Sequence, residues 1–160
     1  MLVVLHTAPK GRGYLARVLE RGTALHVAYP FGLEPLLNGC VYVAPPDRHL
    51  HITGRCVETT MEALEHYTRP AVDVLFRSAA NDFERRVIAV LLSGNGDDGS
   101  AGAIAVHAHG GIVIVQAPSD ALYTSMPRRA LEVVVADYVL PASMISGEVQ
   151  RLLSAVAPAA

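Results

Sequence analysis

Short apolar runs separated by longer amphipathic stretches dominate the hydrophobic pattern of this chain. The runs over 87–92 and 112–115 are apolar at every position, which is typical of parallel strands covered by helices on both faces. The pattern predicts strands over 2–6, 25–29, 40–44, 87–92 and 111–116, helices over 12–21, 71–84, 98–109, 127–132 and 142–156, and a hairpin partner near 49–53. This alternation of strands and helices predicts an α/β fold with a doubly wound, mostly parallel sheet flanked by helices.

Proline and glycine positions support these boundaries. Pro45 and Pro46 end the strand over 40–44, and we expect a small β-hairpin to follow through Asp47. The pair Gly110-Gly111 ends a helix just before its strand, as glycine often does at a helix C-terminus.

Composition and charge exclude several classes of protein. The chain has 160 residues, of which 51% are hydrophobic and 18% charged, so one folded domain with a substantial core is expected. No apolar run approaches the ~20 residues that cross a bilayer, and no secretory signal is evident. A net charge of −2 with scattered arginines argues against a nucleic-acid-binding surface. Cys40 and Cys56 lack metal-type spacing and are expected to be reduced thiols of a cytosolic protein.

The strongest chemical signal is the glycine-rich loop after the strand over 87–92. Its sequence, SGNGDDGS at 93–100, delivers Asp97 and Asp98 to the start of a helix. In open α/β sheets, sites form at the carboxyl ends of strands. His6 ends the first predicted strand in the same way. A histidine and an aspartate at two strand ends suggest two members of a hydrolytic triad.

Other interpretations of these residues stay open. Residues 94–99 match the G-x-G-x-x-G dinucleotide fingerprint, but two carboxylates would oppose a pyrophosphate at the helix N-terminus. In a purely structural interpretation, Asp97 or Asp98 caps the helix that follows. His49 and His51 share one face of a strand and could begin a metal site, although no third ligand is evident nearby. The remaining histidines are interpreted as ordinary surface or boundary residues: His26, His66, His107 and His109.

Several blocks of the sequence resemble the catalytic domain of the CheB-type chemotaxis protein-glutamate methylesterases. The blocks are LVVLH at 2–6, GCVYVAPPDRHL at 39–50, VDVLFRSAA at 72–80, SGNGDDGSAG at 93–102, VQ at 115–116 and SMP at 125–127. Their order and approximate spacing agree with the family, and they cover nearly the whole chain. The resemblance implies a serine-histidine-aspartate hydrolase that removes methyl groups from glutamates of chemoreceptors. Some members of the family also deamidate glutamines there.

The resemblance also implies roles for individual residues. His6 matches the triad base, and Asp98 matches the triad acid. The backbone N–H of Asn95 falls where the family builds part of its oxyanion hole, at a position where the family often has methionine. The resemblance implies no cofactor and no metal. It implies a cytoplasmic protein whose partners are the cytoplasmic domains of methyl-accepting chemoreceptors, with no nucleic acid and no membrane insertion.

The family's nucleophile lies in a G-A-S-x-G-G loop, and no such motif occurs in this sequence. We therefore expect residues 1–160 to form an N-terminally truncated catalytic domain, without the family's first strand and helix and without its response-regulator domain. Ser93 and Ser100 are candidates for a replacement nucleophile, but neither sits in a tight strand-to-helix elbow. We expect little or no esterase activity from the chain alone. The alternative is a non-catalytic receptor-binding module, and an exposed first strand could also support homo-oligomers.

Overall fold

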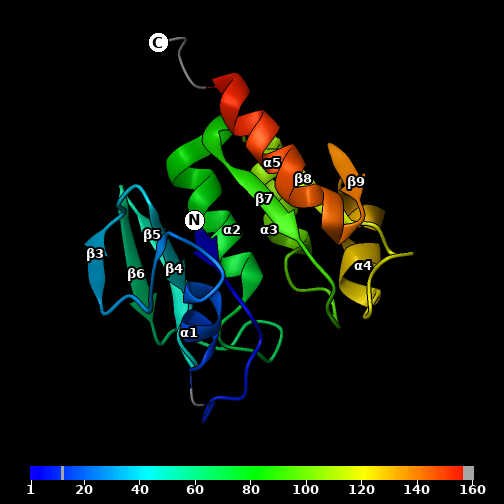
Figure 1. The fold of residues 1–160 in the computed structure, drawn as a ribbon. Coiled ribbons are helices and arrows are strands. Elements are labelled where there is room, and N and C mark those ends of the chain that lie inside the picture. Colours follow the sequence, from blue (N-terminus) through cyan, green and yellow to red (C-terminus); the bar gives the residue numbers. More distant parts are fainter. Residues whose placement is uncertain (12, 157–160) are drawn as a thin grey trace.

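The computed structural model describes residues 1–11 and 13–156. The strands are β1 (Leu2–Val3), β2 (His26–Ala28), β3 (Leu33–Pro35), β4 (Cys40–Val43), β5 (His49–Thr53), β6 (Cys56–Thr60), β7 (Ile88–Leu91), β8 (Ile112–Gln116) and β9 (Tyr138–Leu140). The helices are α1 (Leu15–Glu20), α2 (Val72–Phe83), the 3-10 turn η1 (Glu84–Arg86), α3 (Ser100–Ala108), α4 (Ser125–Val133) and α5 (Ala142–Val156). Figure 1 shows their arrangement. None of the helices in these residues has the length and apolar character needed to cross a membrane.

The strands form three small sheets of three strands each, in the orders β1-β4-β2, β3-β6-β5 and β7-β8-β9. Every pairing in the first and third sheets is parallel. The second sheet is antiparallel. The prediction of an α/β fold with mostly parallel strands and a small hairpin is therefore confirmed. Because β1 and β7 are both strands of parallel sheets, the loops that follow them are places where an α/β site is expected.

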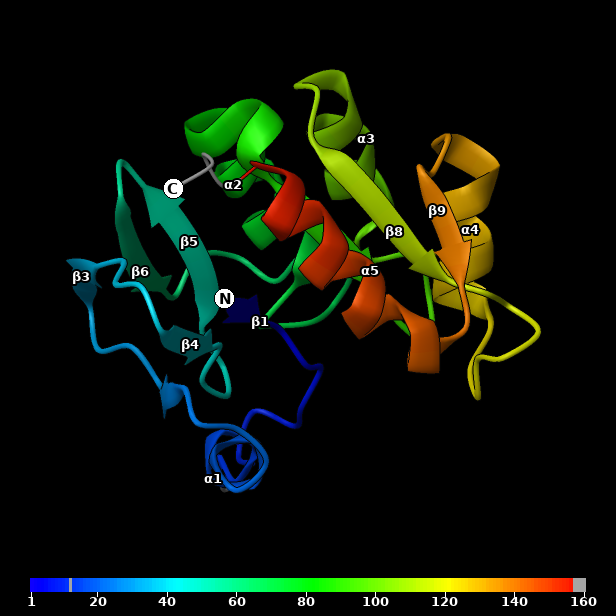
Figure 2. The same ribbon diagram turned by 45° about the horizontal axis from the view of Figure 1, so that its top comes forward.

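Strand β8 shows why its sequence is apolar at every position. Val113 and Val115 belong to the main core, which is formed chiefly with α2 and α3. Ile114 lies in a separate core cluster with Ile145 and Leu152 of α5. Figure 2 shows α5 crossing one face of this sheet, with α3 on the other side. Strands covered on both faces cannot alternate apolar and polar residues.

Helices α2 and α3 pack directly against each other, and Gly102 permits the close approach. A Cβ atom added at Gly102 would lie 2.5 Å from the Cβ of Phe76 and 3.1 Å from Oδ1 of Asp73. Real Cβ atoms do not approach other carbon atoms so closely, because interiors are already close-packed. The two helix N-termini are therefore held side by side.

The structure contains a hairpin, but the predicted pairing of the strand over 40–44 with the strand near 49–53 is wrong. Strand β5 pairs with β6, not with β4. Both edges of β4 are already occupied by the parallel strands β1 and β2, so no edge is left for β5. The connection between β5 and β6 is a two-residue turn in which Gly54 has a φ of 53°. Glycine adopts this left-handed conformation at little cost, and such turns match the twist of a hairpin.

Candidate active site

The candidate site lies where β1 and β7 end. His6 follows β1, and Asp98 lies in the loop between β7 and α3, 92 residues later in the sequence. The structure brings these two predicted site residues into direct contact, with His6 Nε2 2.6 Å from Asp98 Oδ2. The imidazole is 29% exposed, whereas the carboxylate is only 2% exposed. One side of the histidine is therefore open to a reactant, while its acidic partner is shielded from water.

Asp98 also binds the N-terminus of α2. Its Oδ2 accepts a hydrogen bond from the amide of Val72 (2.7 Å), and its Oδ1 accepts one from the amide of Asp73 (2.9 Å). Burial alone would raise the pKa of Asp98, but the hydrogen bonds from His6 and from the two amides outweigh it and lower this pKa below its ordinary value. Asp98 is therefore an ionised carboxylate at neutral pH.

The interpretation of Asp97 or Asp98 as a cap of the following helix is wrong. The N-cap position of α3 is Gly99, and the side chains of Asp97 and Asp98 bind elsewhere, to His66 and to the N-terminus of α2. Gly99 has a φ of 93°, and an added Cβ there would lie 2.6 Å from Leu91 Cδ1. The glycine lets the loop turn tightly, and the Asp98 side chain caps α2, the neighbouring helix.

Asp73 makes the reciprocal interaction, from α2 to the N-terminus of α3. It lies in the first turn of α2, and its Oδ1 accepts a hydrogen bond from the amide of Gly102 in α3 (2.6 Å). Asp73 is fully buried, and burial raises its pKa above the ordinary value despite the hydrogen bond from Gly102. The two helices thus exchange carboxylates at their N-termini, where backbone N–H groups and the helix dipole both favour negative charge.

A second histidine–aspartate pair adjoins the first. His66 Nε2 lies 2.8 Å from Asp73 Oδ2, and His66 Nδ1 lies 2.9 Å from Asp97 Oδ1. The sequence predicts an ordinary surface or boundary residue at His66, and its side chain is 31% exposed. That interpretation missed the network, because the segment before α2 has no periodic pattern that could place His66 beside Asp73.

The two serines considered as replacement nucleophiles do not contact the histidine. The Oγ of Ser93 accepts from the amide of Tyr123 (2.9 Å) and donates to its carbonyl (3.3 Å). The Oγ of Ser100 is buried without a hydrogen-bond partner. Across residues 1–11 and 13–156, no hydrogen bond joins a serine hydroxyl to His6.

The amide of Asn95 differs from its neighbours. The amide of Gly94 donates to the carbonyl of Tyr123 (3.0 Å), and the amide of Gly96 donates to the hydroxyl of Ser125 (3.0 Å). Asn95 is exposed, and within the described part of the chain its amide has no such partner. A free backbone N–H on a loop fixed at both sides is the kind of donor that an oxyanion requires.

The histidine pair considered as the start of a metal site has other roles. His49 is completely buried, and its Nε2 bonds the carbonyl of Ala63 (3.0 Å) while its Nδ1 accepts from the amide of Ala71 (3.2 Å). Neither ring nitrogen is available to a metal. His51 Nε2 lies 3.7 Å from a carboxylate oxygen of the exposed Glu62, which is too long for a hydrogen bond. The structure therefore assigns His49 a structural role.

Ligand-type atoms of Glu65, His66 and Asp73 also lie within 4.8 Å of one another. These atoms are already engaged, because both carboxylate oxygens of Glu65 accept from Arg77 at 2.6 Å and both nitrogens of His66 contact carboxylates. Such a group is an ion-pair network, with no ligand atom left over for a cation.

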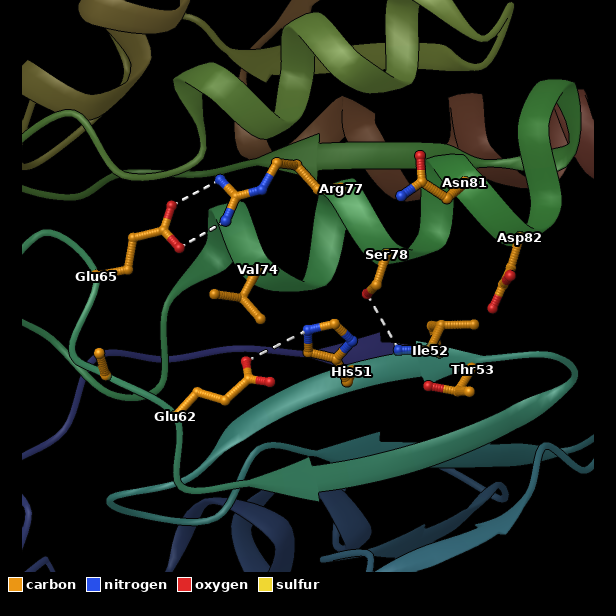
Figure 3. A pocket seen from close by; sticks show the side chains of 11 residues that line it. His51, Ile52, Thr53, Glu62, Glu65, Val74, Arg77, Ser78, Asn81 and Asp82 are labelled. Carbon is orange, nitrogen blue, oxygen red and sulfur yellow. Dashed lines mark hydrogen bonds and ion pairs between the residues drawn. The ribbon is translucent and has the colours of Figure 1, made fainter.

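A hollow of about 500 Å³ borders the loop that carries Asn95 and Asp98. Its walls include Gly96, Asp97 and Arg129. A second cavity of about 400 Å³ lies between β5 and α2, and Figure 3 shows the Glu65–Arg77 ion pair at one end of it. The first hollow reaches the loop of the candidate site through Gly96 and Asp97, but neither His6 nor Asp98 lines it.

Comparison with known proteins gives consistent results. A family model described as CheB methylesterase matches residues 1–149. A putative protein-glutamate methylesterase/protein-glutamine glutaminase of Leptospira interrogans is 33% identical over 147 residues, which is 91% of this chain and 76% of that protein. A protein-glutamate methylesterase/protein-glutamine glutaminase of Nocardioides sp. is 35% identical over 160 residues, but those cover only 44% of its length. The crystal structure of the Thermotoga maritima CheB methylesterase catalytic domain matches with a TM-score of 0.88 and 34% identity, over 94% of this chain and 82% of that one.

Proposed function

This chain belongs to the CheB methylesterase family, and from that membership we propose that it serves the hydrolysis of glutamate methyl esters on chemoreceptors. The same site would deamidate glutamine, since an amide carbonyl needs the same attack and the same oxyanion donors. The observation that supports this proposal most directly is the 2.6 Å contact between His6 and a buried, ionised Asp98. A cytoplasmic location follows from the proposed substrate.

The proposed roles follow from the hydrogen bonding. An ionised Asp98 can only accept, so Nε2 of His6 carries its proton and Nδ1 keeps a free lone pair. Nδ1 is then the atom that takes the proton of a nucleophile. Asp98 fixes this tautomer and stabilises the imidazolium that forms, and loss of such an acid costs ~10⁴ in rate in a comparable triad.

The proposed reaction is ordinary acyl transfer. A serine Oγ attacks the ester carbonyl, its proton moves to Nδ1 of His6, and the oxyanion accepts a hydrogen bond from the amide of Asn95. Methanol leaves with the proton from the imidazolium, and water then attacks the acyl-serine in the same way. The products are glutamate, methanol and the regenerated serine.

We further propose that the nucleophilic serine is not among the serines of this sequence. The support for this is the absence of any serine hydroxyl bonded to His6 in residues 1–11 and 13–156, together with the absence of a G-A-S-x-G-G motif. The chain alone would then have little or no esterase activity. The same observation favours the second candidate function, a module that binds receptors without hydrolysing them.

The experiment is to measure methanol release from methylated chemoreceptor membranes. The 160-residue chain is compared with a fusion in which a segment carrying the family's G-A-S-x-G-G loop precedes it. We expect activity only in the fusion, and Asp98→Asn should remove it while Asp82→Asn, an exposed carboxylate of α2, leaves it intact.

Two results would contradict the proposal. Activity of the unextended chain above its own Asp98→Asn variant would show that a serine of this sequence is the nucleophile. A folded but inactive fusion that still binds receptor membranes would favour the binding module.

A further inference from the structure

The N-termini of α2 and α3 gather an unusual number of titratable groups. Three aspartates and two histidines meet there, joined in pairs as His6–Asp98, His66–Asp73 and His66–Asp97. The proposed reaction uses only the first pair. The second histidine, His66, contacts a carboxylate with each of its ring nitrogens, and these two contacts are called the His66 bridge.

The His66 bridge needs two protons, one at each contact with a carboxylate. A neutral imidazole carries only one. An ionised carboxylate repels the lone pair of a bare ring nitrogen, so the 2.8 Å hydrogen bond to Asp73 and the 2.9 Å ion-pair contact to Asp97 each require a proton between the two atoms. Either the imidazole is doubly protonated, or the Asp73 carboxyl is neutral and donates to Nε2. When the extra proton leaves, only one of the two contacts can remain attractive.

The surroundings favour retention of this proton. Asp73 is completely buried, and Asp98 adds a further negative charge nearby. Glu65, in the same turn as His66, is neutralised by the two-pronged ion pair with Arg77, as Figure 3 shows. Desolvation on its own would lower the pKa of His66, but the hydrogen bond that His66 donates to Asp73 and the charges of the three aspartates raise it overall.

The backbone around His66 is also strained. His66 and Tyr67 have φ values of 49° and 59°, a left-handed conformation that residues with side chains rarely adopt. Reciprocal backbone hydrogen bonds between Glu65 and Thr68 close this turn at 3.1 Å and 2.9 Å. Strain of this kind persists only where surrounding contacts impose it, and here the His66 bridge is such a contact.

The two carboxylates of the bridge flank Asp98 in different ways. Asp73 donates its backbone amide to Asp98 Oδ1, and Asp97 precedes Asp98 in the chain. We propose that His66 is a positioning residue of the site, which in its protonated bridge ties Asp73 to Asp97 and so fixes the carboxylate that faces His6. The inference rests on the role proposed for Asp98, but its test follows protons rather than hydrolysis.

The test is a pH titration of the 160-residue chain by NMR, followed at the assigned ring resonances of His66 and at the amide of Asp73. The informative variant is Asp97→Asn, because an amide can donate to Nδ1 of a neutral imidazole, so the bridge no longer needs its extra proton. We expect its His66 transition to move to lower pH, and the Asp73 amide to follow it. Asp82→Asn removes the same charge from an exposed position and should leave both transitions in place.

The variant His66→Gln separates positioning from other titrations. The part of the Asp73 amide transition that coincides with His66 should disappear, while any part that follows His6 should persist. An unchanged His66 midpoint in Asp97→Asn would overturn the bridge. An Asp73 amide that ignores the His66 transition in the unmodified chain would overturn the positioning role. Both results are independent of the methanol assay, so failure of the proposed esterase function is distinguished from failure of this inference.

Discussion

Replacement of Gly102 by alanine tests the close contact between α2 and α3. Alanine is favoured over glycine inside a helix by about 1 kcal/mol, so helix propensity alone predicts stabilisation. The structure predicts the opposite, because the added Cβ would lie 2.5 Å from Phe76 Cβ and 3.1 Å from Asp73 Oδ1. Overpacking of this kind costs about 1–3 kcal/mol.

The helices would have to separate to admit the methyl group, which would also weaken the 2.6 Å hydrogen bond from Gly102 to Asp73. A hydrogen bond to a carboxylate contributes roughly 1.5–3 kcal/mol. After subtraction of the helix-propensity gain, we expect Gly102→Ala to lower the free energy of unfolding by about 1.5–5 kcal/mol.

The assay is urea unfolding monitored by circular dichroism, with Gly147→Ala as the matched control. Gly147 lies in α5, and an added Cβ there would meet no atom within 4 Å. The control should therefore gain about 1 kcal/mol from helix propensity alone. If Gly102→Ala is as stable as the unmodified chain, the two helices are not in the tight contact described above and the reasoning fails.

Two further predictions concern stability. His66 and Asp73 both have raised pKa values, so the stability they contribute is present at low pH and declines as pH rises, from about 3.8 for Asp73 and from about 6.5 for His66. The pKa of Asp98 is lowered, so its contribution is present above about 3.8 and is lost as pH falls through its folded value. Thermal unfolding should therefore show that Tm falls above about pH 6.5, and His66→Gln should reduce this fall. If Tm of the variant falls as steeply as Tm of the unmodified chain, His66 is not the group responsible. His49→Ala should destabilise the chain by about 2–4 kcal/mol, because it leaves a cavity, unpairs the buried amide of Ala71 and removes the bond to the Ala63 carbonyl. The exposed His107→Ala should change stability by less than about 0.5 kcal/mol, and equal urea midpoints for the two variants would refute the structural role of His49.

The alternation of short apolar runs with amphipathic stretches made the main architecture predictable. The run over 112–115 is apolar on both faces because α3 and α5 cover β8 from opposite sides, and that requirement is visible in the sequence itself. The strands β3, β6 and β9 were not predicted, since β3 and β6 carry polar residues or proline in place of a continuous apolar run and β9 has only three residues. Their pairing depends on which sheet edges other strands leave free.

The candidate site was predictable only in part. His6 and Asp98 each follow a strand, and strand ends converge in α/β sheets, so their contact could be anticipated. The backbone amides and the second histidine that the aspartates of this site bind could not be predicted. Whether Asp98 caps its own helix or its neighbour depends on the turn at Gly99 and on the spacing of α2 and α3. His66 reaches Asp73 through an aperiodic turn, and such turns carry no local signal of their tertiary contacts.

The exchange of carboxylates between α2 and α3 also has a consequence for how the molecule opens. If the N-terminus of α2 unravels, Asp73 withdraws from Gly102, and if the N-terminus of α3 unravels, Asp98 withdraws from Val72. Neither helix can fray alone without uncapping the other, so the two ends form one cooperative unit of local unfolding. In native-state hydrogen exchange the amides of Val72, Asp73 and Gly102 should share one opening free energy and one denaturant dependence, although they belong to different helices.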